Sequence, residues 1–140
     1  MSNYYNEILT DHNMHPVHKH ELSCCTCSRD GINPSCGDEI TLNLRVEKGV
    51  ITDGSFTGSG CAVSQASADI MLDLVIGKST DDALRLRELF MKMIRGEADD
   101  SEIEELEEAG ALSDISHMPA RVKCAVLGWK TLAGLIEDLQ

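Results

Sequence analysis

The hydrophobic pattern of this chain changes its period once, at Gly58-Ser59-Gly60, and this change constrains the fold more than any other feature. Before it, apolar and polar residues alternate, which is typical of a strand with one buried and one solvated face. After it, apolar residues recur every three or four positions, which predicts amphipathic helices. A small antiparallel sheet followed by helices is the α+β class. We therefore expect about three strands packed by five or so helices.

The clearest strand covers residues 40–46, where Ile, Leu and Val alternate with polar residues. Glu47-Lys48-Gly49 predicts a turn, and residues 50–57 follow as the return strand of a hairpin. A short edge strand is expected near residues 24–29, within an otherwise irregular stretch.

Helices are expected at both ends of the chain. A short first helix is indicated by the spacing of Tyr5, Ile8, Leu9 and His12. Four later helices have recognisable boundary residues. The first opens at Cys61 and stops at Gly77, and the second is capped by Ser79 or Thr80. The third begins with a capping box at residues 101–104, and the last has Pro119 at its first helical position.

The chain has 140 residues and a formal net charge of −12. This length predicts one domain, residues 1–140, which needs no disulfides to hold its core. The negative charge argues against a nucleic-acid binder and against an anionic membrane surface. No signal-peptide pattern is present, and no window approaches the roughly 18 apolar residues of a spanning helix. We therefore expect a cytoplasmic protein with reduced thiols.

Acidic residues are concentrated in residues 97–114. This stretch holds nine Asp and Glu and no Lys or Arg, so it carries nine of the twelve net negative charges. A solvated acidic helix and a docking surface for a basic partner are both compatible with such a pattern.

Three of the six cysteines lie beside glycine or basic residues at the expected element boundaries. They are Cys36 in Asn33-Pro34-Ser35-Cys36-Gly37-Asp38, Cys61 after Gly58-Ser59-Gly60, and Cys124 in Ala120-Arg121-Val122-Lys123-Cys124. A helix N-terminus or a nearby cation favours the thiolate, which binds metals and attacks sulfur. With Asp38, the three thiols would make a four-ligand site acceptable to zinc or to an iron–sulfur cluster. The 24 and 62 intervening residues are not a zinc-finger spacing, so thiols packed as small hydrophobes remain the alternative.

These three motifs, in this order, resemble the cysteine motifs of the IscU/NifU-N family of iron–sulfur assembly proteins. The opening residues 4–12 are also similar to the first helix of that family, and the resemblance runs from about residue 4 to residue 136. It implies an IscU/NifU-N-like fold. Two departures look like the SufU branch: the long interval between Cys61 and Cys124, with its acidic insert 97–114, and Lys123 where IscU-type proteins have a histidine.

The SufU-type resemblance implies a role in iron–sulfur cluster assembly. It implies a zinc-dependent acceptor that takes persulfide sulfur from a SufS-type cysteine desulfurase and passes it to a downstream Suf scaffold or apo-proteins. Such a protein activates a desulfurase rather than acting as a stand-alone enzyme. The implied zinc ligands are Cys36, Asp38, Cys61 and Cys124, with Cys36 as the sulfur acceptor and Arg121 in support.

Two other functions use the same residues. One is a scaffold that assembles and transfers a [2Fe–2S] cluster on the same ligands. The other is an inert structural zinc domain that recruits partners. The residue before the third site cysteine, Lys123, favours the sulfur acceptor over the scaffold.

A second group of histidines and cysteines is not explained by the resemblance. It comprises His12, His15, His18, His20, Cys24, Cys25 and Cys27, of which only His12 matches the family opening. Such side chains can bind a metal, and residues 24–27 contain a C-x-x-C that can form a redox dithiol. A connecting loop with incidental thiols, an auxiliary metal or sulfur-relay site, and regulatory oxidation all remain open.

Overall fold

A computed structural model describes residues 3–34 and 37–139, with side chains from residue 7 onward. The elements are α1 (Asn3–Met14), β1 (Cys27–Asn33), β2 (Asp38–Glu47), β3 (Val50–Ser59), α2 (Ala62–Val75), α3 (Thr80–Ile94), α4 (Asp100–Glu105), the 3₁₀ segment η1 (Glu107–His117) and α5 (Pro119–Asp138). The three strands form one antiparallel sheet in the order β1-β2-β3, which confirms the predicted α+β class.

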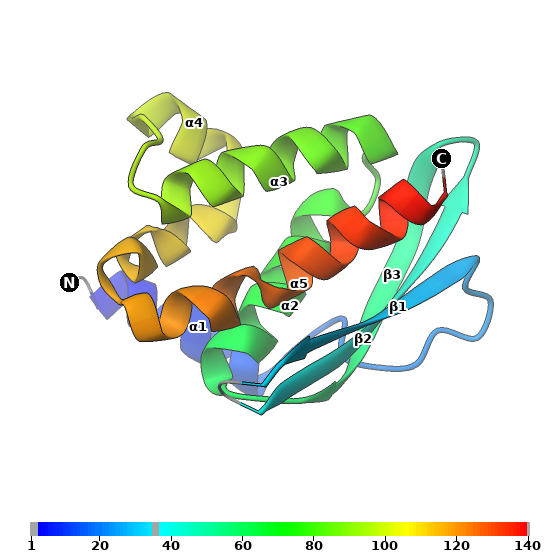
Figure 1. Ribbon diagram of the computed structural model, residues 1–140, viewed down its shortest axis with the longest axis horizontal. Coiled ribbons are helices and arrows are strands. Elements are labelled where there is room, and N and C mark those ends of the chain that lie inside the picture. Colours follow the sequence, from blue (N-terminus) through cyan, green and yellow to red (C-terminus); the bar gives the residue numbers. More distant parts are fainter. Residues whose placement is uncertain (1–2, 35–36, 140) are drawn as a thin grey trace.

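The elements are stacked in layers (Figure 1). Helices α2 and α5 pack together on one face of the sheet, where α5 contacts β1 and β2 and α2 contacts β3. Segments α3, α4 and η1 lie beyond these two helices, and α1 packs against α2 and η1. Helix α2 is therefore enclosed on several sides, which explains why most of its residues are buried.

The hairpin has the predicted buried face and turn. Ile40, Leu42 and Leu44 are at most 1% exposed, as their alternation with polar residues requires. Lys48 and Gly49 both have positive φ values, 52° and 76°, which is the two-residue turn that matches the twist of the paired strands. Because side chains alternate with a period of two, Asp38 shares the buried face of β2 with Ile40.

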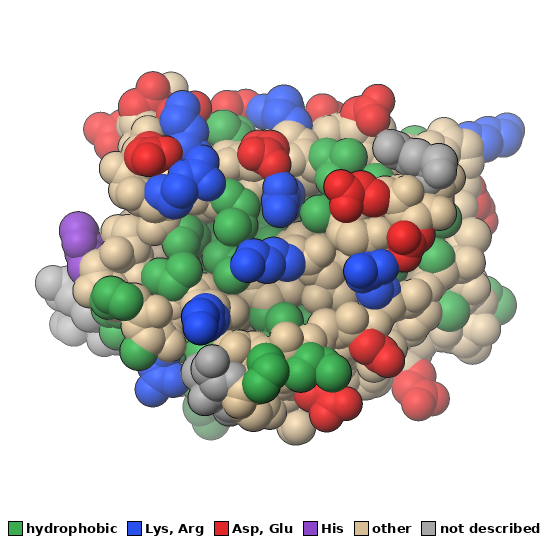
Figure 2. Space-filling model, viewed as in Figure 1, with side chains coloured by type: hydrophobic (Ala, Val, Ile, Leu, Met, Phe, Trp, Pro, Cys, Tyr) green, Lys and Arg blue, Asp and Glu red, His purple; other side chains and the backbone are tan. Residues whose placement is uncertain are grey.

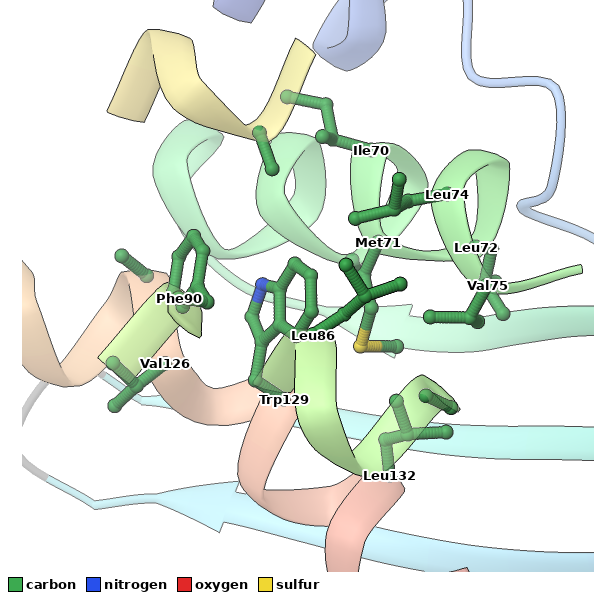
Figure 3. Packing of buried hydrophobic residues seen from close by; sticks show 14 of the residues in the cluster. Ile70, Met71, Leu72, Leu74, Val75, Leu86, Phe90, Val126, Trp129 and Leu132 are labelled. Atoms are coloured by element: carbon green, nitrogen blue, oxygen red, sulfur yellow. The ribbon is translucent and has the colours of Figure 1, made fainter. Parts of the chain in front are cut away.

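The core lies between the sheet and the outer helices (Figure 3). The predicted inner face of α3 is buried, and its Phe90 stacks on Trp129 of α5 with ring centroids 4.3 Å apart. The buried indole Nε1–H of Trp129 donates to Ser67 Oγ of α2 at 3.3 Å. An aromatic pair of this kind contributes about 0.5–1.5 kcal/mol beyond its buried area. These contacts join α2, α3 and α5 into one unit.

Several element boundaries follow the sequence signals. Ser79 is the N-cap of α3, and its hydroxyl accepts a hydrogen bond from the Asp82 N–H at 3.0 Å. Pro119 opens α5, and Gly77 follows the end of α2 with φ +93°. No described helix is both long and apolar enough to cross a membrane.

Two boundary predictions were wrong. The edge strand was expected near residues 24–29, but it begins at Cys27 and continues through Gly31 to Asn33. Gly31 lets the strand continue beneath α5, because a Cβ at this position would lie 2.1 Å from Thr131 Oγ1. The capping box is Asp99 with Glu102, two residues before the expected pair. Asp99 accepts from the Glu102 N–H at 2.9 Å, and Ser101 instead donates its hydroxyl to Asp99.

Candidate metal centre

Three of the four predicted ligands come together from elements that are far apart in the sequence. Asp38 is the first residue of β2, Cys61 is the N-cap of α2, and Cys124 lies in the second turn of α5. One ligand atom of each lies within 4.8 Å of those of the other two. Asp38 and Cys124 are fully buried, and Cys61 is half-buried. The site is thus built where the sheet and both covering helices meet.

The fourth predicted ligand, Cys36, lies outside the described residues. Its chain neighbours are described: β1 ends at Asn33, β2 begins at Asp38, and Gly37 has φ +69°, a left-handed conformation that favours glycine. The place of Cys36 in the site therefore stays a prediction.

The carboxylate of Asp38 is held by hydrogen-bond donors from several elements. Its Oδ1 accepts from the backbone N–H of Cys61 at 2.8 Å and from the Ser64 hydroxyl at 3.2 Å. Its Oδ2 accepts from Asn33 Nδ2 at 3.2 Å. Asn33 also lies opposite Asp38 in the β1–β2 register, so the strand pairing itself presents this amide to the carboxylate.

These bonds keep Asp38 ionised although it is buried. Burial alone would raise the pKa of Asp38, but hydrogen bonds from the Cys61 N–H, the Cys124 thiol, Asn33 and Ser64 outweigh burial and hold the pKa below its usual range. A buried carboxylate with a lowered pKa is suited to bind a cation, because no proton has to be displaced first.

The two thiols have different surroundings. Cys61 caps α2, so it lies beside the N–H groups of the first helical turn, at the positive end of the helix dipole. Cys124 is one turn further into α5, where the dipole of the helix acts more weakly, and Asn33 Nδ2 lies 3.9 Å from its sulfur. Arg121 and Lys123 are exposed on the first turns of α5 and make this edge locally basic.

Gly60 contributes empty space to the site. A Cβ at this position would lie 2.6 Å from both Asp38 Oδ1 and Ser64 Oγ. The glycine is therefore needed so that the carboxylate can reach the N-terminus of α2.

Sequence reasoning missed the roles of Asn33 and Ser64. Asn33 stands five residues before Asp38 across a short connection. Antiparallel pairing of the two strands could therefore have indicated that Asn33 lies opposite Asp38. Ser64 is the third residue of the helix that Cys61 caps, a position where a side chain turns back toward the cap.

The donor set fits zinc. Two thiols and one carboxylate offer sulfur and oxygen ligands of the kind that zinc binds tetrahedrally, with one position left for a fourth ligand. Thiol donors of this kind also hold iron–sulfur clusters.

The remaining histidines and cysteines separate into two places. His12 and His18 contact acidic residues of α2, whereas Cys24 and Cys25 are exposed before β1. Cys27 starts β1 and Asn33 ends it, so the Cα atoms of these two residues are about 20 Å apart along the strand. A sulfur relay from Cys27 to the site would have to cross a distance of this order. Burial, with a smaller effect from Cys25, raises the pKa of Cys27 and disfavours its thiolate.

Comparisons with known proteins show the family of this chain. The model of the NifU-like N-terminal domain family matches residues 4–139. The iron–sulfur cluster assembly scaffold protein IscU of Thermotoga maritima is 44% identical over 96% of this chain and 94% of its own length. The zinc-dependent sulfurtransferase SufU of Bacillus subtilis is 37% identical over 91% of this chain and 86% of its own length. A solved structure assigned as a SUF-system scaffold, from Fervidobacterium islandicum AW-1, is similar with a TM-score of 0.88 and 32% identity, covering 97% of this chain and 99% of that one. With three motif residues converging at one site, the chain belongs to the NifU-like N-terminal domain family of IscU- and SufU-type iron–sulfur cluster assembly proteins.

Proposed function

We propose that this protein is a zinc-dependent sulfur acceptor that takes persulfide sulfur from a SufS-type cysteine desulfurase. The observation that carries the proposal is the convergence of Asp38 with the thiols of Cys61 and Cys124 beside the connection that holds Cys36. The relative from Bacillus subtilis, whose name states zinc-dependent sulfur transfer, supports the same function.

Its position two residues before Asp38 makes Cys36 the best candidate for the sulfur acceptor. Two residues span at most about 7 Å, so the Cα of Cys36 cannot be far from that of Asp38. Cys61 is the N-cap of α2, and Cys124 lies within α5 and is fully buried. Cys36 stands in the sequence between the end of β1 and the start of β2, and the proposal assigns it as the ligand that leaves the metal and meets the partner.

The transfer is a thiol exchange with no net oxidation. The Cys36 thiolate attacks the outer sulfur of the persulfide on the desulfurase, and a new S–S bond forms on Cys36. The old S–S bond breaks, and its electron pair leaves with the desulfurase cysteine as a thiolate. Bound zinc would keep the site thiols deprotonated before the exchange. Exposed Arg121 adds positive charge at this edge, where the partner's persulfide would approach.

The sulfur would then pass to a downstream Suf scaffold or to apo-proteins by the same kind of exchange. In this proposal the protein is an activator of the desulfurase, and the partner supplies the chemistry that releases sulfur from cysteine. The proposed place of action is the cytoplasm.

A second candidate function is a scaffold that assembles and transfers a [2Fe–2S] cluster as its cargo. It is favoured by the thiol-rich donor set and by the scaffold name of the Thermotoga maritima relative. Both functions use Asp38, Cys61 and Cys124. The two functions therefore have to be distinguished by whether the site keeps zinc or forms a cluster.

Anaerobic reconstitution separates the two functions. Native protein should contain about one zinc per chain at this site. It should keep that zinc, and show no sulfur-to-iron absorption, when iron and sulfide are added without oxygen. Formation of a cluster that moves to an apo-ferredoxin would favour the scaffold and contradict the sulfur-acceptor proposal.

A further inference from the structure

A second group of metal-binding side chains lies between α1, α2 and η1. His12 comes from the last turn of α1, Asp69 and Asp73 come from α2, and Glu108 comes from η1. Asp69 follows the N-cap Cys61 by eight residues, so it is about 12 Å further along the helix axis. This group is therefore separate from the cysteine centre.

Both ring nitrogens of His12 face carboxylates. Nδ1 lies 2.7 Å from Asp69 Oδ2, and Nε2 lies 2.9 Å from Glu108 Oε1. An ionised carboxylate can only accept, and a neutral imidazole has one N–H to donate. A second positive centre is therefore needed at His12, which can be either a second proton or a metal ion bound to one nitrogen.

Burial increases this demand for positive charge. His12 is 6% exposed and Asp69 is fully buried, so solvent contributes little to neutralising them. Three carboxylates meet here with two imidazoles, since His18 Nε2 also lies 2.6 Å from Asp73 Oδ1. Even with both imidazoles protonated, the group would keep a formal charge of −1.

The atoms are close enough to bind one ion. One ligand atom each from His12, Asp69 and Asp73 lies within 4.8 Å of the other two, so small shifts of these side chains would place all three at the roughly 2.0–2.2 Å from a shared ion that metal–ligand bonds require. A pocket of about 50 Å³, lined in part by Asp73 and Glu108, adjoins the group. A pocket of this size has room for water molecules as further ligands.

We propose that His12 Nδ1, Asp69 and Asp73 bind a divalent transition-metal cation. Glu108 accepts the Nε2–H of His12, which is the arrangement that orients a metal-binding imidazole. The backbone N–H of His18 donates to Asp69 Oδ1 at 2.8 Å and leaves Oδ2 for the ion. One imidazole and two carboxylates are borderline-to-hard ligands, which suit Zn²⁺, Fe²⁺ or Mn²⁺ without any thiol.

This cation would join α1 to α2, and through Glu108 to η1. Binding at Nδ1 releases a proton, so the affinity should rise with pH. The proposal does not depend on the sulfur-acceptor function, because none of its residues belongs to the cysteine centre.

Equilibrium dialysis against Zn²⁺, with a thiol-free reductant, tests the proposal. Wild type should bind one zinc more per chain than the variant Asp73→Asn at the same free zinc concentration. The Asp73 side chain is 42% exposed, so this substitution removes a ligand without opening the core. Glu108→Gln should weaken the additional site by about 10–100-fold.

Asp11→Asn and His15→Asn are matched controls, because both residues are exposed at the same end of α1. Both variants should bind zinc as wild type does. Co²⁺ loading adds a second readout: Asp73→Asn should leave the sulfur-to-cobalt absorption unchanged, because the lost ion has only nitrogen and oxygen ligands. Equal zinc binding by wild type and Asp73→Asn, or loss of the sulfur-to-cobalt absorption in that variant, would overturn the proposal.

Discussion

At the scale of single residues, Asp38 is the buried carboxylate around which the candidate cysteine centre is arranged. It is fully buried, yet its pKa is held below the usual range by donors from β1, α2 and α5. Removing such donors costs more than losing one hydrogen bond, because a buried carboxylate is left without compensation. The surroundings of this carboxylate are therefore part of the site.

Replacing Gly60 by alanine tests this view. The added Cβ would lie 2.6 Å from Asp38 Oδ1, so the carboxylate has to move away from the N-terminus of α2. Zinc affinity should fall by about 10–100-fold, as for other changes beside a metal ligand. Gly128→Ala is the control, because its Cβ would make an ordinary contact of 3.4 Å with Ala68. Equal zinc affinity of Gly60→Ala and wild type, in competition with a chelator, would show that this space is not needed.

His12 predicts a pH-dependent stability of the metal-free protein. Burial alone would lower the pKa of His12, but hydrogen bonds with Asp69 and Glu108 outweigh burial and raise the pKa above its ordinary value of 6.5. A raised pKa means that the stabilisation is fully present below pH 6.5 and is lost as the pH rises through the folded-state value.

The measurement is the free energy of unfolding of wild type and His12→Asn, with a chelator present, between pH 5.5 and 9, a range chosen around the pKa of histidine. The difference between the two proteins should shrink as the pH rises. The other charged groups at this place, Asp69, Asp73, Glu108 and His18, are present in both proteins. A difference that stays constant across this range would contradict a charged His12.

At the scale of elements, α2 organises the molecule. Its N-terminus supplies Cys61 and Ser64 to the cysteine centre, and its middle supplies Asp69 to the contact with α1. The helix also packs on β3 and α5, so the residues that it supplies to the cysteine centre and to the contact with α1 are held in place by its neighbours. The start of the next helix, α3, is set by a local cap.

Ser79→Ala tests the local start of α3. The hydroxyl accepts the Asp82 N–H at 3.0 Å, and its loss should cost about 1 kcal/mol in the free energy of unfolding. Thr80→Ala, one residue later and without this role, should change stability by less than about 0.5 kcal/mol. Denaturant titration of both variants checks the prediction, and equal stabilities of the two would contradict the cap.

Much of this arrangement could be predicted, because the signals are local. The alternation of apolar and polar residues from Ile40 to Val46 predicted the buried face of β2, and Pro119 predicted the start of α5. The extension of β1 through Gly31 could not be predicted, since it depends on how closely α5 passes. Likewise, only the packing of α1 against α2 and η1 brings His12 to Asp69 and Glu108.

At the scale of the whole molecule, the acidic stretch 97–114 is partly neutralised from within. Lys92 contacts Glu102 at 2.7 Å, and Arg85 contacts Glu105 at 3.0 Å, so basic residues of α3 face the insert. Figure 2 shows red and blue side chains interspersed along this edge. Glu104 and Glu107 are exposed and are the better candidates for contact with a basic partner.

If this stretch docks the desulfurase, Glu104→Gln with Glu107→Gln should weaken association, and most at low salt. Glu47→Gln with Glu137→Gln is the matched control, because it removes the same charge from exposed positions outside the stretch. Calorimetric titrations at two ionic strengths give the comparison. Equal affinities of the two double variants would leave the acidic stretch as a solvated surface.

The desulfurase rate with and without this protein tests the central claim most directly. Cys36→Ala should abolish the stimulation by wild type, whereas Cys25→Ala, which changes an exposed thiol before β1, should stimulate fully. The zinc content of each protein is measured in the same samples. Stimulation by Cys36→Ala equal to that by wild type would show that Cys36 is not the sulfur acceptor.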